Sequence, residues 1–171
     1  MNITATATKP IKAIVYVENT YQDAELAPDN LEMVNSIPWS IWIHHWLCSM
    51  SLDTDLDYEL GLRLTGDRQI QKLNCQYRSM DKPTDVLAFA TADDEIIIPP
   101  EVDEPTYLGD IIISLDTALK QAAQQQHSIV VELAWLASHG LLHLLGWDHP
   151  DDRSLKQMLE QQWELIQSIE I

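Results

Sequence analysis

The stretch SIVVELAWLASHGLLHLLGWDH, residues 128–149, combines a long hydrophobic segment with three histidines and a glycine. Its apolar residues recur at helical spacing, which predicts a helix from Ser128 to about Leu145. Gly146 occupies the position where helices commonly end in a left-handed conformation, which glycine adopts without strain. The chain is therefore expected to turn back immediately after this helix.

Helices are also predicted on both sides of this stretch, at residues 116–126 and at residues 151–169. Asp151 and Asp152 open the last helix, where a carboxylate accepts hydrogen bonds from free backbone N–H groups and interacts favourably with the helix dipole. The final third of the chain is therefore expected to be helical.

Most of the predicted strands lie in the first two-thirds of the chain. Alternating apolar residues or short apolar runs, typical of strands, occur in four segments: residues 11–19, 57–64, 84–90 and 107–114. Residues 91–106 are acidic and contain prolines, which indicates an exposed excursion between two of these strands.

Two more helices are predicted among the strands, at residues 36–50 and 65–78. Pro38 favours a helix start in the first of them, which is expected to pack into the core. The residues near one face of that helix are Ile41, Trp42, His45 and Trp46. Because the strands concentrate early in the chain and the helices late, the sequence predicts an α+β fold with a mixed β-sheet packed with helices. Residues 1–171 are expected to form a single domain. The apolar fraction of 46% is enough for a real core.

The chain has 10 basic and 27 acidic residues, and its formal net charge of −17 argues against a nucleic acid held by general electrostatic attraction. Five of the basic residues nevertheless lie within residues 63–82, where only Asp67 and Asp81 oppose them, so this segment carries a charge of +3. The segment is either a local patch that binds a polyanion or an ordinary solvated helix face, and charge alone leaves both open.

The two cysteines, Cys48 and Cys75, lack the spacing of a redox or metal motif, and reduced thiols in a cytosolic compartment are expected rather than a disulfide. No segment near the N-terminus has the pattern of a secretory signal, and none approaches the roughly 20 apolar residues of a membrane span. The composition therefore predicts a cytoplasmic protein without a membrane partner.

The histidines of the quoted stretch have the spacing of metal ligands. His139 and His143 are four residues apart, so both imidazoles project from one helix face, and the turn at Gly146 can bring His149 to the same point. Three imidazoles suit one Zn²⁺ ion with an open coordination position, as in catalytic zinc sites. The alternative, core histidines, is costly because three imidazoles would be buried among leucines without a shared partner. A metal site is therefore predicted at this C-terminal helix-turn.

Other polar residues allow a less specific interpretation. His44, His45 and His127 have no such geometry and are expected to be structural. Asp148 precedes His149 and either orients a metal-bound imidazole or caps a turn.

The histidine spacing also matches the peptidase pattern HExxHxxGxxH, in which the glutamate serves as general base. Gly140 occupies the position of that glutamate and has no group that accepts a proton. A metal cage without a peptidase base is predicted, and hence a substrate other than a peptide.

Three sequence blocks carry a resemblance to a known family. HGLLHLLGWDH, residues 139–149, resembles the signature HGxLHLxGyDH of the YbeY family of rRNA maturation factors, with Trp147 where tyrosine is usual. LNCQYRSMDKPTDVLAFA, residues 73–90, is similar to the family's LNxxYRxxDxPTDVLSFP and departs from it at Ala88 and Ala90. LGDIIIS, residues 108–114, resembles LGDIxIS. The blocks occur in the expected order.

The resemblance implies a metal-dependent endoribonuclease in which His139, His143 and His149 hold one Zn²⁺ ion, and in which Arg78 and His143 are catalytic. It further implies cleavage of single-stranded RNA in maturation of the 16S rRNA 3′ end and in ribosome quality control. The partners would then be an rRNA precursor and the ribosome or ribosomal proteins. Arg78 suits this role on chemical grounds also, because it lies in the basic segment and a guanidinium matches phosphate oxygens.

Zinc at this site would polarise a phosphoryl oxygen or lower the pKa of water toward about 7. Water and the RNA's own 2′-hydroxyl both remain open as the attacking group. Two other functions remain open as well, a metal-dependent peptidase-like hydrolase and a non-catalytic, zinc-stabilised adaptor that binds the ribosome. The acidic body predicts weak binding of free RNA and a need for a partner that presents it.

Overall fold

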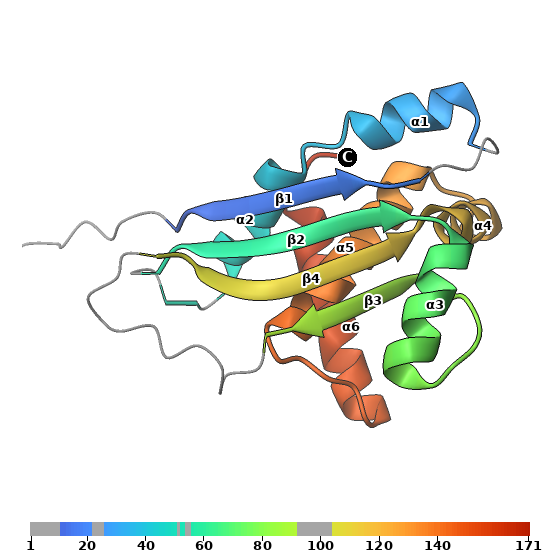
Figure 1. The fold of residues 1–171 in the computed structure, drawn as a ribbon. Helices are drawn as coiled ribbons and strands as arrows, with labels where there is room; N and C mark the ends of the chain where they lie inside the picture. Colours follow the sequence, from blue (N-terminus) through green and yellow to red (C-terminus); the bar gives the residue numbers. More distant parts are fainter. Residues whose placement is uncertain (1–10, 22–25, 51, 54–55, 92–103) are drawn as a thin grey trace, which may run out of the picture.

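The computed structural model describes residues 11–21, 26–50, 52–53, 56–91 and 104–171. Within them the chain forms four strands and six helices (Figure 1). The strands are β1 (Ala13–Asn19), β2 (Tyr58–Thr65), β3 (Val86–Ala90) and β4 (Thr106–Ser114). The helices are α1 (Pro28–Asn35), α2 (Trp39–Ser49), α3 (Asp67–Arg78), α4 (Leu115–Gln125), α5 (Ile129–Leu144) and α6 (Asp152–Gln167).

The sheet is mixed, with the strand order β1-β2-β4-β3. Strands β1, β2 and β4 run parallel, and β3 pairs antiparallel with β4 at one edge. Along β2, side chains alternate between the buried face and the opposite face of the sheet, as the period of two in its sequence predicts. The predicted α+β architecture, a mixed sheet packed with helices, is confirmed.

Helix α5 covers one face of the sheet at its centre, and α2 and α6 lie on the same side (Figure 1). Its apolar residues are buried against the leucines of β2 and the isoleucines of β4 in one hydrophobic core. Helix α6 is capped by Asp151, whose carboxylate accepts a hydrogen bond from the backbone N–H of Ser154, so this predicted capping residue is confirmed. Among the described residues, no helix combines the length and apolar character that a membrane span requires.

The core face of α2 differs from the prediction. Ile41 is 59% exposed and His45 is exposed as well, whereas Trp42 and Trp46 are buried as expected. The helix begins directly after Pro38, and the core-facing residues are Trp39, Trp42, Ile43, Trp46 and Leu47. The apolar content of this helix is high on every side, so helical spacing alone did not identify which side is buried. Of the predicted excursion over residues 91–106, residues 92–103 lie outside the described residues, and its last residue, Thr106, already belongs to β4.

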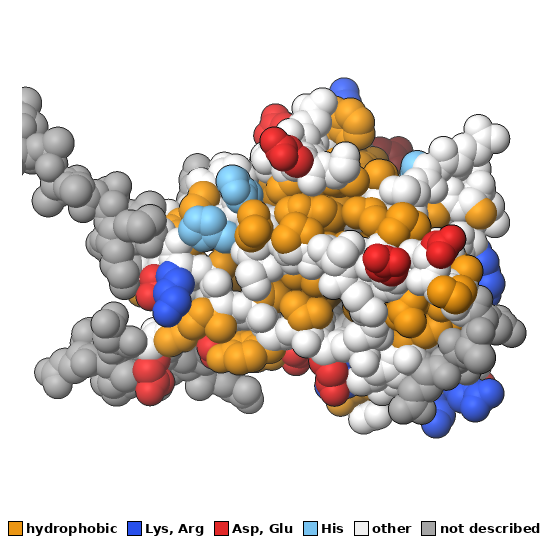
Figure 2. Space-filling view, turned by 90° about the horizontal axis from the view of Figure 1, so that it is seen from above, with side chains coloured by type: hydrophobic (Ala, Val, Ile, Leu, Met, Phe, Trp, Pro, Cys, Tyr) orange, Lys and Arg blue, Asp and Glu red, His pale blue; other side chains and the backbone are white. Residues whose placement is uncertain are grey.

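Exposed hydrophobic side chains are found on α1, α2 and β1. They include Val17, Leu31, Met33 and Ile41. Figure 2, which views the molecule from the side of α1, shows hydrophobic side chains spread over this face between polar ones.

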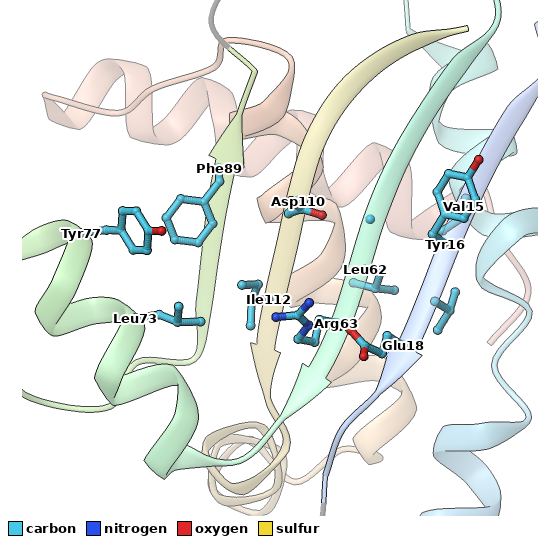
Figure 3. Close-up of a pocket in the computed structure, with 12 residues that line it drawn as sticks. Val15, Tyr16, Glu18, Leu62, Arg63, Leu73, Tyr77, Phe89, Asp110 and Ile112 are labelled. Carbon is cyan, nitrogen blue, oxygen red and sulfur yellow. Dashed lines mark hydrogen bonds and ion pairs between the residues drawn. The ribbon is translucent and has the colours of Figure 1, made fainter.

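The second face of the sheet is only partly covered. Helix α3 packs on β3 and β4 through a small cluster of Ile70, Leu87 and Ile112. The rest of this face, over β1 and β2, is a groove of about 790 Å³ (Figure 3). Tyr77 of α3 and Phe89 of β3 stand at one side of the groove with their ring centroids 4.9 Å apart.

A partly buried polar network ties α3 to α4 at the carboxyl ends of β2 and β4. The Asp67 carboxylate accepts hydrogen bonds from the hydroxyls of Ser114 and Thr117, both at 2.6 Å, and from Lys120 Nζ at 2.9 Å. Burial alone would raise the pKa of Asp67, but these three donors outweigh it, and the net pKa lies below its usual value. The charged form of Asp67 therefore stabilises the fold.

Asp67→Ala is expected to lower the free energy of unfolding at pH 7 by about 1–3 kcal/mol, because the buried Ser114 hydroxyl loses its acceptor. The folded-state pKa is lowered, so the stabilisation is present at neutral pH and is lost as the pH falls below about 4. Urea denaturation at both pH values measures this difference. The exposed Glu160→Ala serves as control, with an expected change below about 0.5 kcal/mol. An equal difference at pH 7 and at pH 3 would contradict the assignment.

Candidate metal centre

The turn after α5 has the predicted geometry. Gly146 has a φ of +85°, in the left-handed region that favours glycine. Its backbone N–H donates to the carbonyl of His143, and the N–H of Trp147 donates to the carbonyl of Leu142, both at 3.0 Å. These bonds reverse the chain at the end of the helix and return His149 to the helix face that carries the other histidines.

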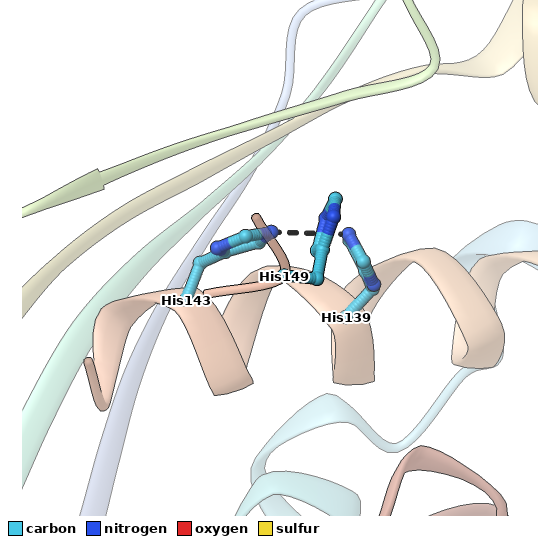
Figure 4. Close-up of side chains that lie close together, drawn as sticks. All are labelled: His139, His143 and His149. Carbon is cyan, nitrogen blue, oxygen red and sulfur yellow. Dashed lines mark hydrogen bonds between the residues drawn. The ribbon is translucent and has the colours of Figure 1, made fainter. Parts of the chain in front are cut away.

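The three imidazoles meet at one point (Figure 4). One ring nitrogen from each of His139, His143 and His149 lies within 4.8 Å of the other two. The Nε2 atoms of His139 and His143 are 3.1 Å apart, and the ring centroids of the three pairs are 4.7, 5.5 and 5.3 Å apart. The cluster could therefore hold a metal ion, as the spacing predicted.

The donor set fits zinc. Tetrahedral zinc with bonds of about 2.0–2.1 Å places its donor nitrogens roughly 3.3 Å apart, close to the observed separation of the first two histidines. Burial lowers the pKa of both His139 and His143, and the neighbouring imidazoles lower it further. Both rings are therefore neutral at neutral pH, with a lone pair available for a metal. The described part of the chain adds no fourth histidine, cysteine or carboxylate to the cluster, so these residues would supply three donors to a bound ion.

Gln162, which sequence analysis did not identify, holds one of the rings in place. Its side chain is fully buried, and its Nε2 donates to the carbonyl of Trp135 at 2.8 Å, which directs Oε1 toward His139. The Nδ1 of His139 lies 3.3 Å from that oxygen and donates to it, which leaves Nε2 free to coordinate. The signal in the sequence is a glutamine at a core position of α6, between the buried Met158 and Leu165.

Asp148 has the turn role rather than a hydrogen bond to an imidazole. Its Oδ1 accepts from the backbone N–H of His149 at 2.8 Å, which fixes the backbone that carries the third histidine. The histidines outside the quoted stretch lie apart from the cluster, as predicted. His127 pairs with the buried Glu132 at 3.1 Å, and His44 lies 3.7 Å from the sulfur of Cys48. Both cysteines are free and exposed.

The histidine cluster lines a cavity of about 460 Å³, which also receives Arg78 from the end of α3. Arg78 is exposed, and no carboxylate among the described residues forms an ion pair with it. Arg63, from the same basic segment, is instead paired with Glu18 at 2.8 Å on the open face of the sheet. The basic segment is thus divided, and only part of it faces the cavity.

Asp85 is a second cavity residue that sequence analysis did not identify. Its Oδ1 accepts from the backbone N–H of Val86 at 2.8 Å and from the hydroxyl of Thr84 at 3.1 Å. Its Oδ2 accepts from the amide of Gln121 at 3.0 Å. Both oxygens are engaged by the protein, so the position of this carboxyl group at the edge of the cavity is fixed.

The glycine in the place of the peptidase glutamate has a packing role. A Cβ atom at Gly140 would lie 2.7 Å from Cγ2 of the fully buried Ile111 on β4. A side chain at this position would therefore enter the interface between α5 and the sheet. A glutamate there would meet Ile111 at its first side-chain atom, so the peptidase residue does not fit this position without a shift of the helix or of the strand.

Gly140→Ala is expected to destabilise the fold by about 1–3 kcal/mol, the cost of overpacking a core, although alanine normally favours a helix over glycine. Thermal or urea denaturation measures the change. The double variant Gly140→Ala with Ile111→Ala should be more stable than the sum of the two single changes predicts, because the obstructing methyl group is gone. Strict additivity would show that the close contact is not the cause.

Comparison with known proteins places the chain in a family. The family model described as Endoribonuclease YbeY matches residues 27–170. Endoribonuclease YbeY of Trichormus variabilis is 50% identical over 159 residues, 91% of this chain and 90% of its own length, and that of Synechocystis sp. is 44% identical over 165 residues, 94% and 92%.

A solved structure supports the fold. The solution structure of TM1509 from Thermotoga maritima matches with a TM-score of 0.54 and 22% identity, over 91% of this chain and 88% of that one. The family match and these curated relatives cover most of the sequence, including the three-histidine segment. The chain therefore belongs to the YbeY endoribonuclease family.

Proposed function

We propose that this protein is a zinc-dependent endoribonuclease that cleaves single-stranded RNA in the cytoplasm, with residues 1–171 forming one domain. Its role would be maturation of the 16S rRNA 3′ end and ribosome quality control, with an rRNA precursor and the ribosome or ribosomal proteins as partners. The observation that supports this most strongly is the meeting at one cavity of three imidazoles and of the Arg78 guanidinium, which no described carboxylate pairs with. Membership of the endoribonuclease family supports RNA as the substrate.

In this proposal His139, His143 and His149 hold one Zn²⁺ ion per chain. The bound ion would supply a Lewis acid for a phosphoryl oxygen and for water. Arg78 donates two hydrogen bonds to the scissile phosphate and stabilises the negative charge that grows there in the transition state. Gln162 keeps the ring of His139 in the orientation that coordination requires.

The acidic surface bears on substrate capture. With a net charge of −17, the body of the protein repels a polyanion, and the cationic side chain at the cavity is a small exception. Free RNA is therefore expected to bind weakly, and a partner that presents the RNA would raise the local concentration of substrate. A shallow dependence of RNA affinity on salt fits a few phosphate contacts, and a steep one would contradict this arrangement.

A metal-removal experiment tests the proposed function. The purified protein is treated with a chelator and then titrated with Zn²⁺, and cleavage is followed on one RNA, single-stranded and annealed to its complement. Cleavage of the single strand should disappear on chelation and return at one equivalent of zinc. An intact, zinc-loaded protein that cuts no RNA but binds ribosomal particles would favour the adaptor, and peptide cleavage would favour the hydrolase.

The ends of the products identify the attacking group. A 2′,3′-cyclic phosphate on the upstream fragment indicates attack by the RNA's own 2′-hydroxyl, and a 3′-hydroxyl excludes it. RNA with a deoxynucleotide at the cleavage position separates the same two mechanisms, because it lacks the internal nucleophile. Cleavage of that substrate at an unchanged rate would show that water attacks.

A further inference from the structure

The cavity of the metal centre continues along α6 into two neighbouring hollows. Leu159 lines both the metal cavity and an apolar hollow of about 380 Å³ on the surface of α6. Trp163 lines that hollow and a third one of about 440 Å³. The third hollow shares Asp85, Trp135 and Leu136 with the metal cavity. The three hollows therefore adjoin one another beside the histidine cluster.

The outer side of α6 carries an apolar stripe that the fold does not use. Leu155, Leu159 and Trp163 are spaced four residues apart, so they lie in one row along the helix. All three are exposed, and the indole of Trp163 is 55% exposed. The helix packs into the core through Met158, Gln162 and Leu165 on its other side, and the row of Leu155, Leu159 and Trp163 is not part of that packing. A half-exposed indole at the edge of a candidate active site offers a flat, apolar surface that suits a flat, apolar ligand.

From this placement we infer a nucleobase-binding subsite, and the inference rests on the proposed function. A base of a nucleotide next to the scissile phosphate stacks on Trp163, with Leu159 and Trp135 as the apolar surroundings. Proteins bind unpaired bases by stacking them on aromatic side chains, and every base offers a flat face for this. The distance to the cleavage point is short because the hollows adjoin the metal cavity.

The charges around Trp163 favour a base over a phosphate. The apolar hollow is flanked by Asp152, Lys156 and Glu160, and Lys156 is within 3.7 Å of Glu160. The third hollow, which Trp163 also lines, adds Asp85 and Glu132. One cation against four carboxyl groups does not attract the RNA backbone, whereas a neutral base is not repelled by them.

The third hollow offers an amide that suits the edge of a base. It is lined by Gln121, Gln125 and His127, of which Gln121 already donates to Asp85 and His127 already contacts Glu132 and the carbonyl of Ser128. The amide of Gln125 can donate and accept hydrogen bonds, which is what the edges of unpaired bases require. A protein partner is the less favoured occupant, because a hollow lined by six residues is far smaller than a stable protein interface.

The subsite accounts for a preference for single strands in physical terms. A base in a duplex is stacked on its neighbours and paired, so its face cannot reach Trp163 without being pulled out of the helix. An unpaired base reaches it at no such cost. Cleavage beside the subsite would thus be restricted to RNA whose bases are free to leave the stack.

The test combines binding and cleavage. Fluorescence anisotropy gives the Kd of the zinc-loaded protein for a labelled single-stranded RNA of about ten nucleotides, and gel analysis gives kcat and KM on the same RNA. A set of RNAs carries one abasic nucleotide at successive positions around the cleavage point. The variants are Trp163→Leu, which keeps apolar bulk without a ring, and Trp163→Phe, which keeps a ring. Tyr16→Leu is the control, because Tyr16 is an exposed aromatic residue on the opposite face of the sheet.

Trp163→Leu should raise Kd and KM by between about 5-fold and about 150-fold, the fold-change equivalent of ~1–3 kcal/mol, with a smaller effect on kcat. One abasic position should weaken the unmodified protein by a similar factor and have no further effect in Trp163→Leu. Trp163→Phe should recover most of the loss, and Tyr16→Leu should behave like the unmodified protein.

Other outcomes overturn the subsite. It is wrong if Trp163→Leu binds and cuts RNA like the unmodified protein, or if its loss is the same on every abasic RNA. Loss of binding to ribosomal proteins with normal RNA binding would assign the row to a protein partner instead. If base-dependent binding through Trp163 is present while the unmodified protein cuts no RNA, the proposed function fails and the subsite stands.

Discussion

His143→Ala is expected to lose stoichiometric zinc and to cut single-stranded RNA more than about 100-fold more slowly than the unmodified protein. Changes beside a metal site typically cost 10- to 100-fold in affinity or activity, and this change removes a donor atom itself. The Nε2 of His143 lies 3.1 Å from the Nε2 of His139 and is one of the three proposed donor atoms. Without it, only two imidazoles remain to hold the ion. Zinc content after dialysis and the initial rate of cleavage are the two measurements.

The control for His143→Ala is His45→Ala, because His45 is exposed on α2, outside the cluster. That variant should keep one zinc ion per chain and full activity. Circular dichroism establishes that both variants remain helical, so a loss of zinc is not a loss of fold. A His143→Ala protein that retains one tightly bound zinc ion would contradict the assignment of the three histidines as the zinc ligands.

Arg78→Ala is expected to reduce kcat by about 10²–10³-fold while zinc content stays near one ion per chain. This is the usual cost of removing one preorganised donor to a charged transition state. The arginine reaches the same cavity as the histidines but belongs to α3, so its removal leaves the cage intact. Arg78→Lys should recover only part of the rate, because a lysine supplies the charge without the two-pronged geometry.

Arg68→Ala is the matched control for that prediction. Arg68 is an exposed arginine on the same helix and is not among the residues that line the metal cavity. Its removal should leave kcat and zinc content unchanged. If zinc is lost together with the guanidinium of Arg78, the division between metal binding and phosphate binding is mistaken.

The histidine cluster could be predicted because its geometry is local. A spacing of four residues on a helix and a glycine turn decide where His139, His143 and His149 lie, and both features are visible in eleven consecutive residues. The strand and helix order followed from hydrophobic periodicity for the same reason, except for the short helix α1 (Pro28–Asn35), which the sequence analysis did not predict. Prediction was reliable where neighbours in sequence are neighbours in space.

The remaining features depend on contacts between distant residues. Gln162 reaches His139 across 23 positions, and nothing in the local pattern of α6 says which helix its buried amide meets. Ile41 was assigned to the core because α2 is apolar on most sides, and only the docked helix reveals that this side faces outward. Arg78 was connected to the site by chemistry and by family resemblance, not by spacing. Contacts between residues far apart in the sequence decide these positions, and hydrophobic periodicity carries no information about such contacts.

The absence of a side chain at Gly140 lets α5 lie directly against Ile111 of β4. The helix that presents His139 and His143 therefore rests on the sheet through an aliphatic contact. We expect the placement of these two imidazoles to respond to changes in the hydrocarbon packing beneath them, even when every polar group is untouched.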